Sequence, residues 1–150
     1  MENFITQKLE KTLHDTLPYF DLSEHDLAKT YGEGKWSIHQ ILCHLTDAET
    51  VLYDRIRRTI SNPGNTVMGF EQDLWAEKLE YNSFPLELCK DLFAANRKAL
   101  IHTASKFYEK YGHHESIHNV AGPKSLREFF DKVVWHNEQH LEQMDLALKK

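Results

Sequence analysis

The residues best suited to chemistry lie near the end of the chain, in the stretch VVWHNEQHLEQM from Val133 to Met144. His136 and His140 are four residues apart, and in a helix this spacing places two side chains on the same side, one turn apart. Apolar residues flank the pair, so its face borders the apolar stripe of the helix. Two such imidazoles are either exposed polar side chains or ligands of a metal ion, and the pair alone does not decide.

A third imidazole, His44, belongs to a second helical pattern and is flanked by apolar residues there. Three imidazoles buried together without partners would be costly, and protonation would place like charges side by side. A divalent ion resolves both problems because it binds the lone pairs of neutral imidazoles. His44, His136 and His140 are therefore candidate ligands of one divalent ion, and their spacing alone leaves this open. The alternative for His44 alone is a hydrogen-bonded core residue.

Two polar residues are placed to support such a site. Asp47 follows His44 by one turn, and Gln143 follows His140 by three residues, so both are predicted as orienting groups or as a further ligand. The segment HNEQH also resembles the zinc-protease motif HExxH, but Glu138 comes one position late and points away from the two histidines.

The remaining reactive residues favour structural interpretations. His113, His114 and His118 fall in a polar, glycine-bearing turn that predicts exposed side chains. Cys43 and Cys89 lie among apolar residues and are predicted to be buried thiols rather than nucleophiles. Three tryptophans could line a pocket, but core packing explains them as simply: Trp36, Trp75 and Trp135. Three further residues could bind an anionic cosubstrate, but a solvated helix surface is the simpler interpretation: Tyr53, Arg55 and Arg57.

Four long helical patterns carry these residues. Ser37 with Gln40, and Ser125 with Glu128, form the capping boxes that start the second and fourth helices. Shorter helices are expected after Ser23 and over 72–78, and no strand alternation of useful length is present. The long helices are predicted at about 3–17, 38–60, 85–108 and 125–148. The prediction is an all-α four-helix bundle in one domain, 1–150, with long connections between helices 1 and 2 and between helices 2 and 3. The apolar face of the second helix is predicted to include Ile38, Ile41, Leu42, Leu45, Ala48, Leu52 and Ile56, and that of the third Leu88, Leu92, Leu100 and Ile101.

Composition excludes several classes of protein. The formal net charge is -5 and no basic stripe occurs, which argues against nucleic-acid binding. No apolar run is long enough to span a membrane, and the first residues lack the pattern of a signal peptide. With two cysteines, reduced thiols and a cytoplasmic location are expected.

The segments GKWSIHQILCHLTDAETVLYDRI and WHNEQHLEQM, about ninety residues apart, resemble the DinB/YfiT-like superfamily of small bacterial metalloproteins. FEQDLWAEKLEYNS between them resembles the middle of the same family. The resemblance implies a four-helix bundle, often a homodimer, with His44, His136 and His140 as the ligands of zinc or nickel.

Three nitrogen ligands leave at least one coordination position open, as in catalytic metal sites. An ion in such a site can activate water, giving a hydrolase, or a small thiol, giving an S-transferase. The resemblance implies the second, because characterised branches of the family use bacillithiol or mycothiol as a low-molecular-weight thiol cosubstrate. The expectation is therefore a metal-dependent S-transferase acting on small electrophiles. The alternatives are a metal-dependent hydrolase and a non-enzymatic, metal-stabilised binding module.

Overall fold

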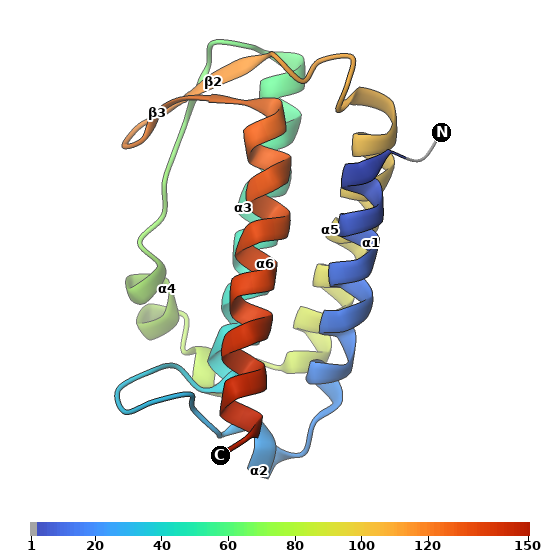
Figure 1. Ribbon diagram of the computed structural model, residues 1–150. Coiled ribbons are helices and arrows are strands. Elements are labelled where there is room, and N and C mark those ends of the chain that lie inside the picture. Colours follow the sequence, from blue (N-terminus) through green and yellow to red (C-terminus); the bar gives the residue numbers. More distant parts are fainter. Residues whose placement is uncertain (1–2) are drawn as a thin grey trace.

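Four long helices packed side by side dominate the computed structural model, which describes residues 3–150 (Figure 1). They are α1 (Phe4–Thr16), α3 (Ile38–Ser61), α5 (Leu86–Phe107) and α6 (Leu126–Leu148). The predicted four-helix bundle is confirmed, and each predicted long helix lies within one or two residues of its observed bounds.

The two helices that carry the histidines begin where their capping boxes predict. The Ser37 side chain accepts a hydrogen bond from the Gln40 backbone N–H, and the Gln40 side chain accepts one from the Ser37 N–H at 2.9 Å. Ser125 and Glu128 form the same pair of bonds at the start of α6. Each box satisfies backbone donors that the first helical turn leaves free, and so fixes the first residue of its helix.

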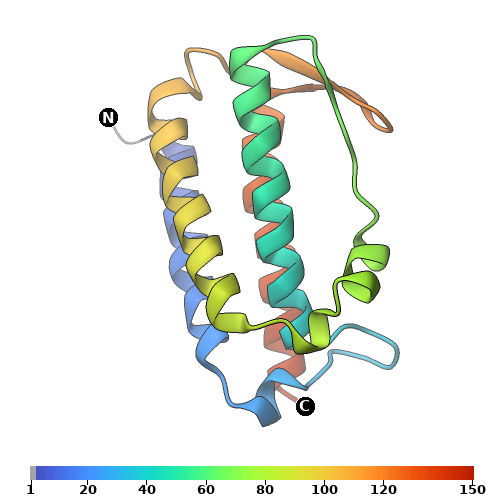
Figure 2. The same ribbon diagram turned by 180° about the vertical axis from the view of Figure 1, so that it is seen from behind.

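The helices do not simply alternate in direction. α1 packs against α5 and α6, and α3 packs against the same two helices. α3 and α5 run in the same direction, as do α1 and α6 (Figures 1 and 2). Because α3 has 24 residues, the chain must return about 36 Å along the bundle before α5 can begin. The connection over 62–85 covers this distance and carries β1 (Thr66–Val67), α4 (Gln72–Lys78) and the 3-10 turn η2 (Tyr81–Ser83).

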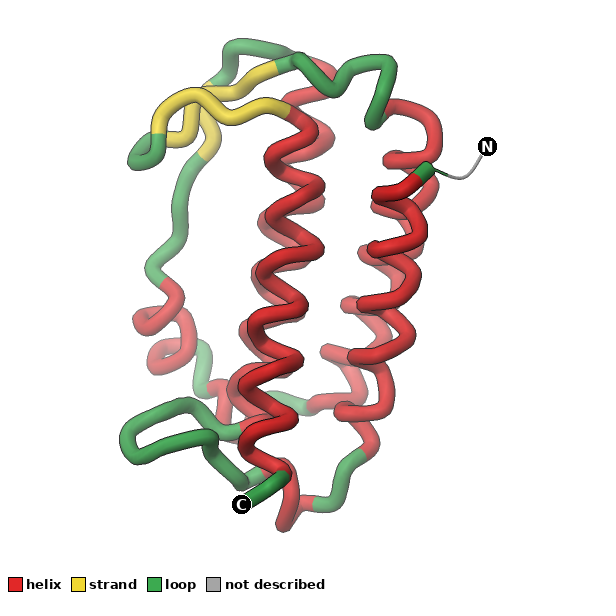
Figure 3. The backbone as a smooth tube through the Cα atoms, in the orientation of Figure 1, coloured by secondary structure: helices red, strands yellow, loops and turns green. Residues whose placement is uncertain are grey.

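A small three-stranded sheet closes one end of the bundle beside α3 and α6 (Figure 3). β1 pairs in parallel with β2 (Glu115–His118), which pairs antiparallel with β3 (Gly122–Ser125). The expectation that the chain has no strand, and that 111–124 is only a polar turn, is wrong. The strands have two to four residues, too few for an alternating pattern, and the pairing of Thr66 with Ile117 joins segments far apart in sequence.

The first connection contains the 3-10 helix η1 (Leu17–Asp21) and the short helix α2 (Glu24–Leu27), for which Ser23 is the N-cap as predicted. Over the part of the chain that the structure describes, none of the helices has the length and apolar character that crossing a membrane requires.

The core has the predicted face of α3 but a different face of α5. The seven apolar α3 residues named above are all buried. On α5, in contrast, Leu88 and Leu92 are 56% and 47% exposed, so their predicted burial is wrong. The buried stripe of α5 consists of Cys89, Phe93, Arg97, Leu100, Thr103 and Ala104.

Arg97 lies in the middle of that stripe with a fully buried side chain. Its Nε and Nη2 donate to the two carboxylate oxygens of Glu49 at 2.5 and 2.9 Å. Nη2 also donates to Asn137 Oδ1 at 2.8 Å, and Nη1 donates to Thr12 Oγ1 and the Leu9 carbonyl of α1. One guanidinium therefore joins all four long helices. Because Asn137 follows His136 directly, this network also fixes α6 against α3 next to the histidines.

Candidate metal centre

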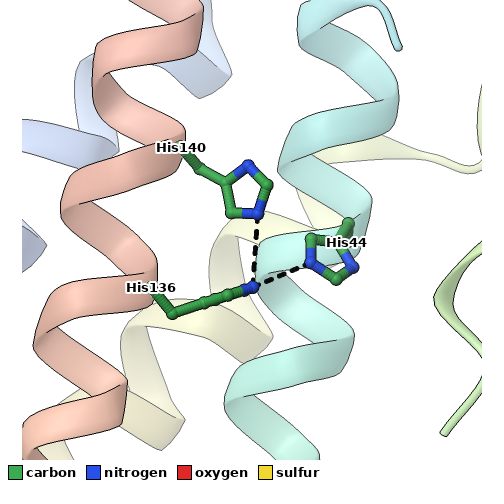
Figure 4. A group of neighbouring side chains, drawn as sticks. All are labelled: His44, His136 and His140. Carbon is green, nitrogen blue, oxygen red and sulfur yellow. Dashed lines mark hydrogen bonds between the residues drawn. The ribbon is translucent and has the colours of Figure 1, made fainter. Parts of the chain in front are cut away.

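Three imidazoles from two facing helices converge on one point (Figure 4). His44 comes from α3, and His136 and His140 come from successive turns of α6. The Nε2 atom of His136 lies 2.9 Å from Nε2 of His44 and 3.2 Å from Nε2 of His140. One ligand atom from each residue lies within 4.8 Å of the other two. The structure thus brings together the three histidines that the sequence singled out.

These distances suit ligands of one ion better than hydrogen bonds among imidazoles. An imidazole Nε2 has either one proton or one in-plane lone pair, so His136 cannot form two good bonds at once. For a Zn–N bond of about 2.0–2.1 Å, two tetrahedral ligands lie about 3.3 Å apart, and two ligands at a right angle about 2.9 Å apart. The observed spacings of 2.9 and 3.2 Å fall in that range. The donor set, three nitrogens and no thiolate, is that of a site with an open coordination position.

Burial keeps the three rings neutral, as metal ligands must be. Burial first, and then the neighbouring His140, lowers the pKa of His44 to about 3. Burial, followed by His140, His44 and Lys132, lowers the pKa of His136 to about 2. Burial also lowers the pKa of His140, although its bond to Gln143 acts in the opposite direction. Near neutral pH all three lone pairs are therefore available.

Gln143 holds His140 in the orientation that a ligand needs. The Nδ1 atom of His140 lies 2.8 Å from Oε1 of Gln143. Because the amide oxygen accepts, His140 carries its proton on Nδ1, and its Nε2 lone pair points toward the other two histidines. Gln143 therefore contacts His140, and its role as an orienting group stays a prediction.

Asp47 lies elsewhere. Its carboxylate accepts a hydrogen bond from the Tyr81 hydroxyl, and it lines a small apolar cavity on the α5 side of α3. Burial raises the pKa of the Asp47 carboxyl, an effect that the bond from Tyr81 partly offsets. In the described residues, the metal-ligand cluster comprises the three histidines without Asp47. His44 Nδ1 is consequently buried without a hydrogen-bond partner among residues 3–150.

The other candidates separate into exposed, buried and site-facing groups. His113 and Glu138 are exposed, and Cys43 and Cys89 are buried with their sulfurs 3.8 Å apart. Of the tryptophans, Trp36 packs on His44 with ring centres 5.0 Å apart, Trp75 packs on Phe70, and Trp135 is 56% exposed.

An open cleft of about 420 Å³ lies directly beside the histidines. His44 and His136 form part of its wall, and the start of α4 and the end of β2 line it as well. Two further lining residues, Arg55 and His118, are only half-exposed, which corrects the expectation that both are solvated surface residues. For Arg55, its position on α3 was a signal in the sequence that could have placed it in the cleft. His118 had no such signal, because the sheet that brings it to the cleft was not predicted.

Comparison with known proteins agrees with this fold. A family model described as the DinB superfamily matches residues 8–144. A protein of Oceanobacillus iheyensis, named a putative metal-dependent hydrolase, is 28% identical over 127 residues, which cover 85% of this chain and 73% of that protein. A protein of Geobacillus kaustophilus with the same descriptive name is 26% identical over 134 residues, covering 86% and 73%.

The same architecture has been seen in a solved structure. YfiT from Bacillus subtilis, described as a probable metal-dependent hydrolase with an unusual four-helix bundle topology, superimposes with a TM-score of 0.88 at 16% identity. The match covers 97% of this chain and 85% of YfiT, and at this identity it shows the fold alone. The family match extends over nearly the whole chain, including both helices that carry the histidines, and this chain therefore belongs to the DinB superfamily.

Proposed function

We propose that this protein is a metal-dependent hydrolase of small molecules that holds one divalent ion, zinc or nickel, with His44, His136 and His140. The observation that carries the proposal is the convergence of three neutral Nε2 atoms, two of them in the wall of an open cleft. The names of the relatives from O. iheyensis and G. kaustophilus support the same reaction class.

Each residue at the site would have its own role. His44 and His136 hold the ion from two helices, and Gln143 keeps the His140 lone pair directed at it. When bound, a divalent ion in such a site acidifies a water molecule and polarises the bond under attack. Trp36 packs on His44, and Phe70 lies 6.1 Å from the same ring, so aromatic side chains shield one side of the site from water.

Thiol transfer, the reaction implied by the sequence resemblance, needs the same open position and differs in the nucleophile that occupies it. Either reaction would place its small-molecule substrate in the cleft. The cleft is large enough, because cavities of about 300–1,000 Å³ are usual for small organic ligands. The two reactions are therefore best separated by experiment.

The test is a screen of zinc-loaded and nickel-loaded protein for hydrolysis of p-nitrophenyl esters and p-nitroanilides. A parallel arm tests thiol transfer with 1-chloro-2,4-dinitrobenzene plus glutathione or cysteine. Hydrolysis should require the ion, disappear in His136→Ala and persist in His113→Ala, since His113 is an exposed histidine outside the cluster. Activity only in the thiol arm would replace the hydrolase with an S-transferase. Protein that binds the ion but is inactive in both arms would favour a binding module.

A further inference from the structure

The cleft beside the histidines is lined by hydrogen-bond donors that the proposed hydrolysis does not use. Arg55 of α3, His118 of β2 and Lys132 of α6 share its wall with His44 and His136. Among its lining residues, Glu71 alone has a carboxylate. The cleft therefore has two permanent positive charges against one negative charge, before any ion is bound.

Arg55 has a donor with no partner. Its Nη2 donates to the Met68 carbonyl at 2.7 Å, which anchors the side chain to the connection after α3. Its Nε is buried and has no hydrogen-bond partner within residues 3–150. The neighbouring Asp54 is engaged elsewhere, with Arg58 at 2.8 Å. Because Nε is buried, a ligand in the cleft would bond to the guanidinium N–H groups that stay accessible, and the positive charge of Arg55 strengthens such a bond.

His118 presents a second donor whose proton position is fixed. Its Nδ1 accepts from the backbone N–H groups of Val120 and Ala121 at 3.1 and 3.0 Å. The neutral ring must then carry its proton on Nε2. A Cβ at Gly69 would lie 3.3 Å from that Nε2 and 3.0 Å from Cε1, so the glycine keeps the space next to the ring open.

Lys132 adds an exposed positive charge on the histidine side of the cleft. It lies one turn before His136 on α6, so the two side chains project to the same side. Its Nζ is 5.2 Å from the centre of the exposed Trp135 ring. In the part of the chain that the structure describes, neither Lys132 nor Arg55 belongs to an ion pair. Both charges therefore remain available to a ligand.

We propose that this cleft binds the anionic group of the substrate, a carboxylate or a phosphonate-like oxyanion, through Arg55 and His118, with Lys132 as a further positive charge. Arg55 is eleven residues from His44, or about 16 Å along α3, and both residues line the cleft. The substrate class is thus an elongated small molecule with an oxyanion several bonds away from the bond that is cleaved. That last step rests on the proposed hydrolase function, whereas binding of the oxyanion does not require the ion.

The test uses titration calorimetry on metal-free protein, with phenylphosphonate and benzoate as probes and benzyl alcohol as the neutral counterpart, all at one ionic strength. One or both anions should bind, and the tighter one identifies the oxyanion. Arg55→Gln should weaken binding about tenfold or more, because it removes a charge-assisted hydrogen bond. Arg57→Gln is the matched control, since Arg57 is exposed on the same helix and lies over the Tyr53 ring.

A second variant guards against loss of folding. His118→Asn keeps an acceptor near the Nδ1 position for the backbone of Val120 and Ala121 but removes Nε2. It should weaken anion binding about as much as Arg55→Gln does, while the melting curve stays near that of the wild type. Equal effects of Arg55→Gln and Arg57→Gln, or benzyl alcohol binding as tightly as the anions, would overturn the proposal.

The two proposals fail separately. His140 holds the ion but does not line the cleft, so His140→Ala should lose the ion and keep anion binding in the metal-free assay. Arg55-dependent anion binding in a protein with no hydrolytic activity would support the anion site and refute the hydrolase. Ion-dependent hydrolysis without any Arg55-dependent anion binding would do the reverse.

Discussion

Gln143 offers a sharp test of how the histidine site is held. Its Oε1 lies 2.8 Å from Nδ1 of His140, and this bond sets both the tautomer and the orientation of the ring. Gln143→Leu keeps a side chain of similar size but removes the acceptor. Loss of such a supporting partner weakens metal binding about 10- to 100-fold, or about 1.4–2.7 kcal/mol. Gln143→Glu should instead retain or strengthen binding, because a carboxylate makes the ligating imidazole more basic.

The assay is competition for Zn²⁺ against a chromophoric chelator at pH 7.5. Gln139→Leu makes the same exchange at an exposed position of the same helix and serves as the control. The expected order of affinity is Gln143→Glu at or above wild type, Gln139→Leu equal to wild type, and Gln143→Leu clearly below. An unchanged affinity in Gln143→Leu would refute the argument that this bond orients His140.

Three other predictions concern stability and assembly. Arg97→Met should cost about 3–5 kcal/mol in urea unfolding, because it leaves the Glu49 carboxylate buried and unpaired, while exposed Lys98→Met should change little; equal effects would contradict a structural role for the network. Bound metal should raise the melting temperature near pH 7.5, because a free-ion concentration a hundredfold above the dissociation constant adds about 2.7 kcal/mol to the free energy of unfolding. This chelator-sensitive difference should vanish toward pH 5. The direction of this pH dependence follows from the pKa of His44 and His136, which folding lowers to about 3 and about 2. As pH falls below about 6.5, the unfolded chain takes up protons that the folded chain does not, so stability is lost. Release of the ion adds to this loss. A chelator effect as large at pH 5 as at pH 7.5 would contradict this. Sedimentation should show a homodimer, and only a 17.6 kDa monomer at high concentration would refute that prediction.

The parts of the fold that sequence could predict are those with local signals. The capping boxes at Ser37 and Ser125 fix the starts of α3 and α6 within a few residues, and the 3.6-residue repeat gives the buried face of α3. The histidines could be found because two of them share one helix face and the third borders an apolar face on another helix.

The rest depends on contacts between distant segments. Arg97 is buried because partners such as Glu49, 48 positions earlier, meet it inside the bundle, and the positions of the apolar residues alone indicated a different face of α5. Likewise, His118 reaches the cleft through the pairing of β1 with β2, and strands of two to four residues leave no pattern in the sequence. The position of Asp47 had a local rationale, one turn after His44, but its carboxylate is taken by Tyr81, which lies in the connection before α5.

Elemental analysis of the untagged protein and its histidine variants, purified in parallel with limiting zinc or nickel, tests whether the three histidines share one ion. We expect one divalent ion per chain in the wild type and in His113→Ala, and none in His44→Ala, His136→Ala or His140→Ala, with circular dichroism confirming that each variant folds. A full equivalent of ion in a folded His44→Ala protein would contradict a site shared between α3 and α6.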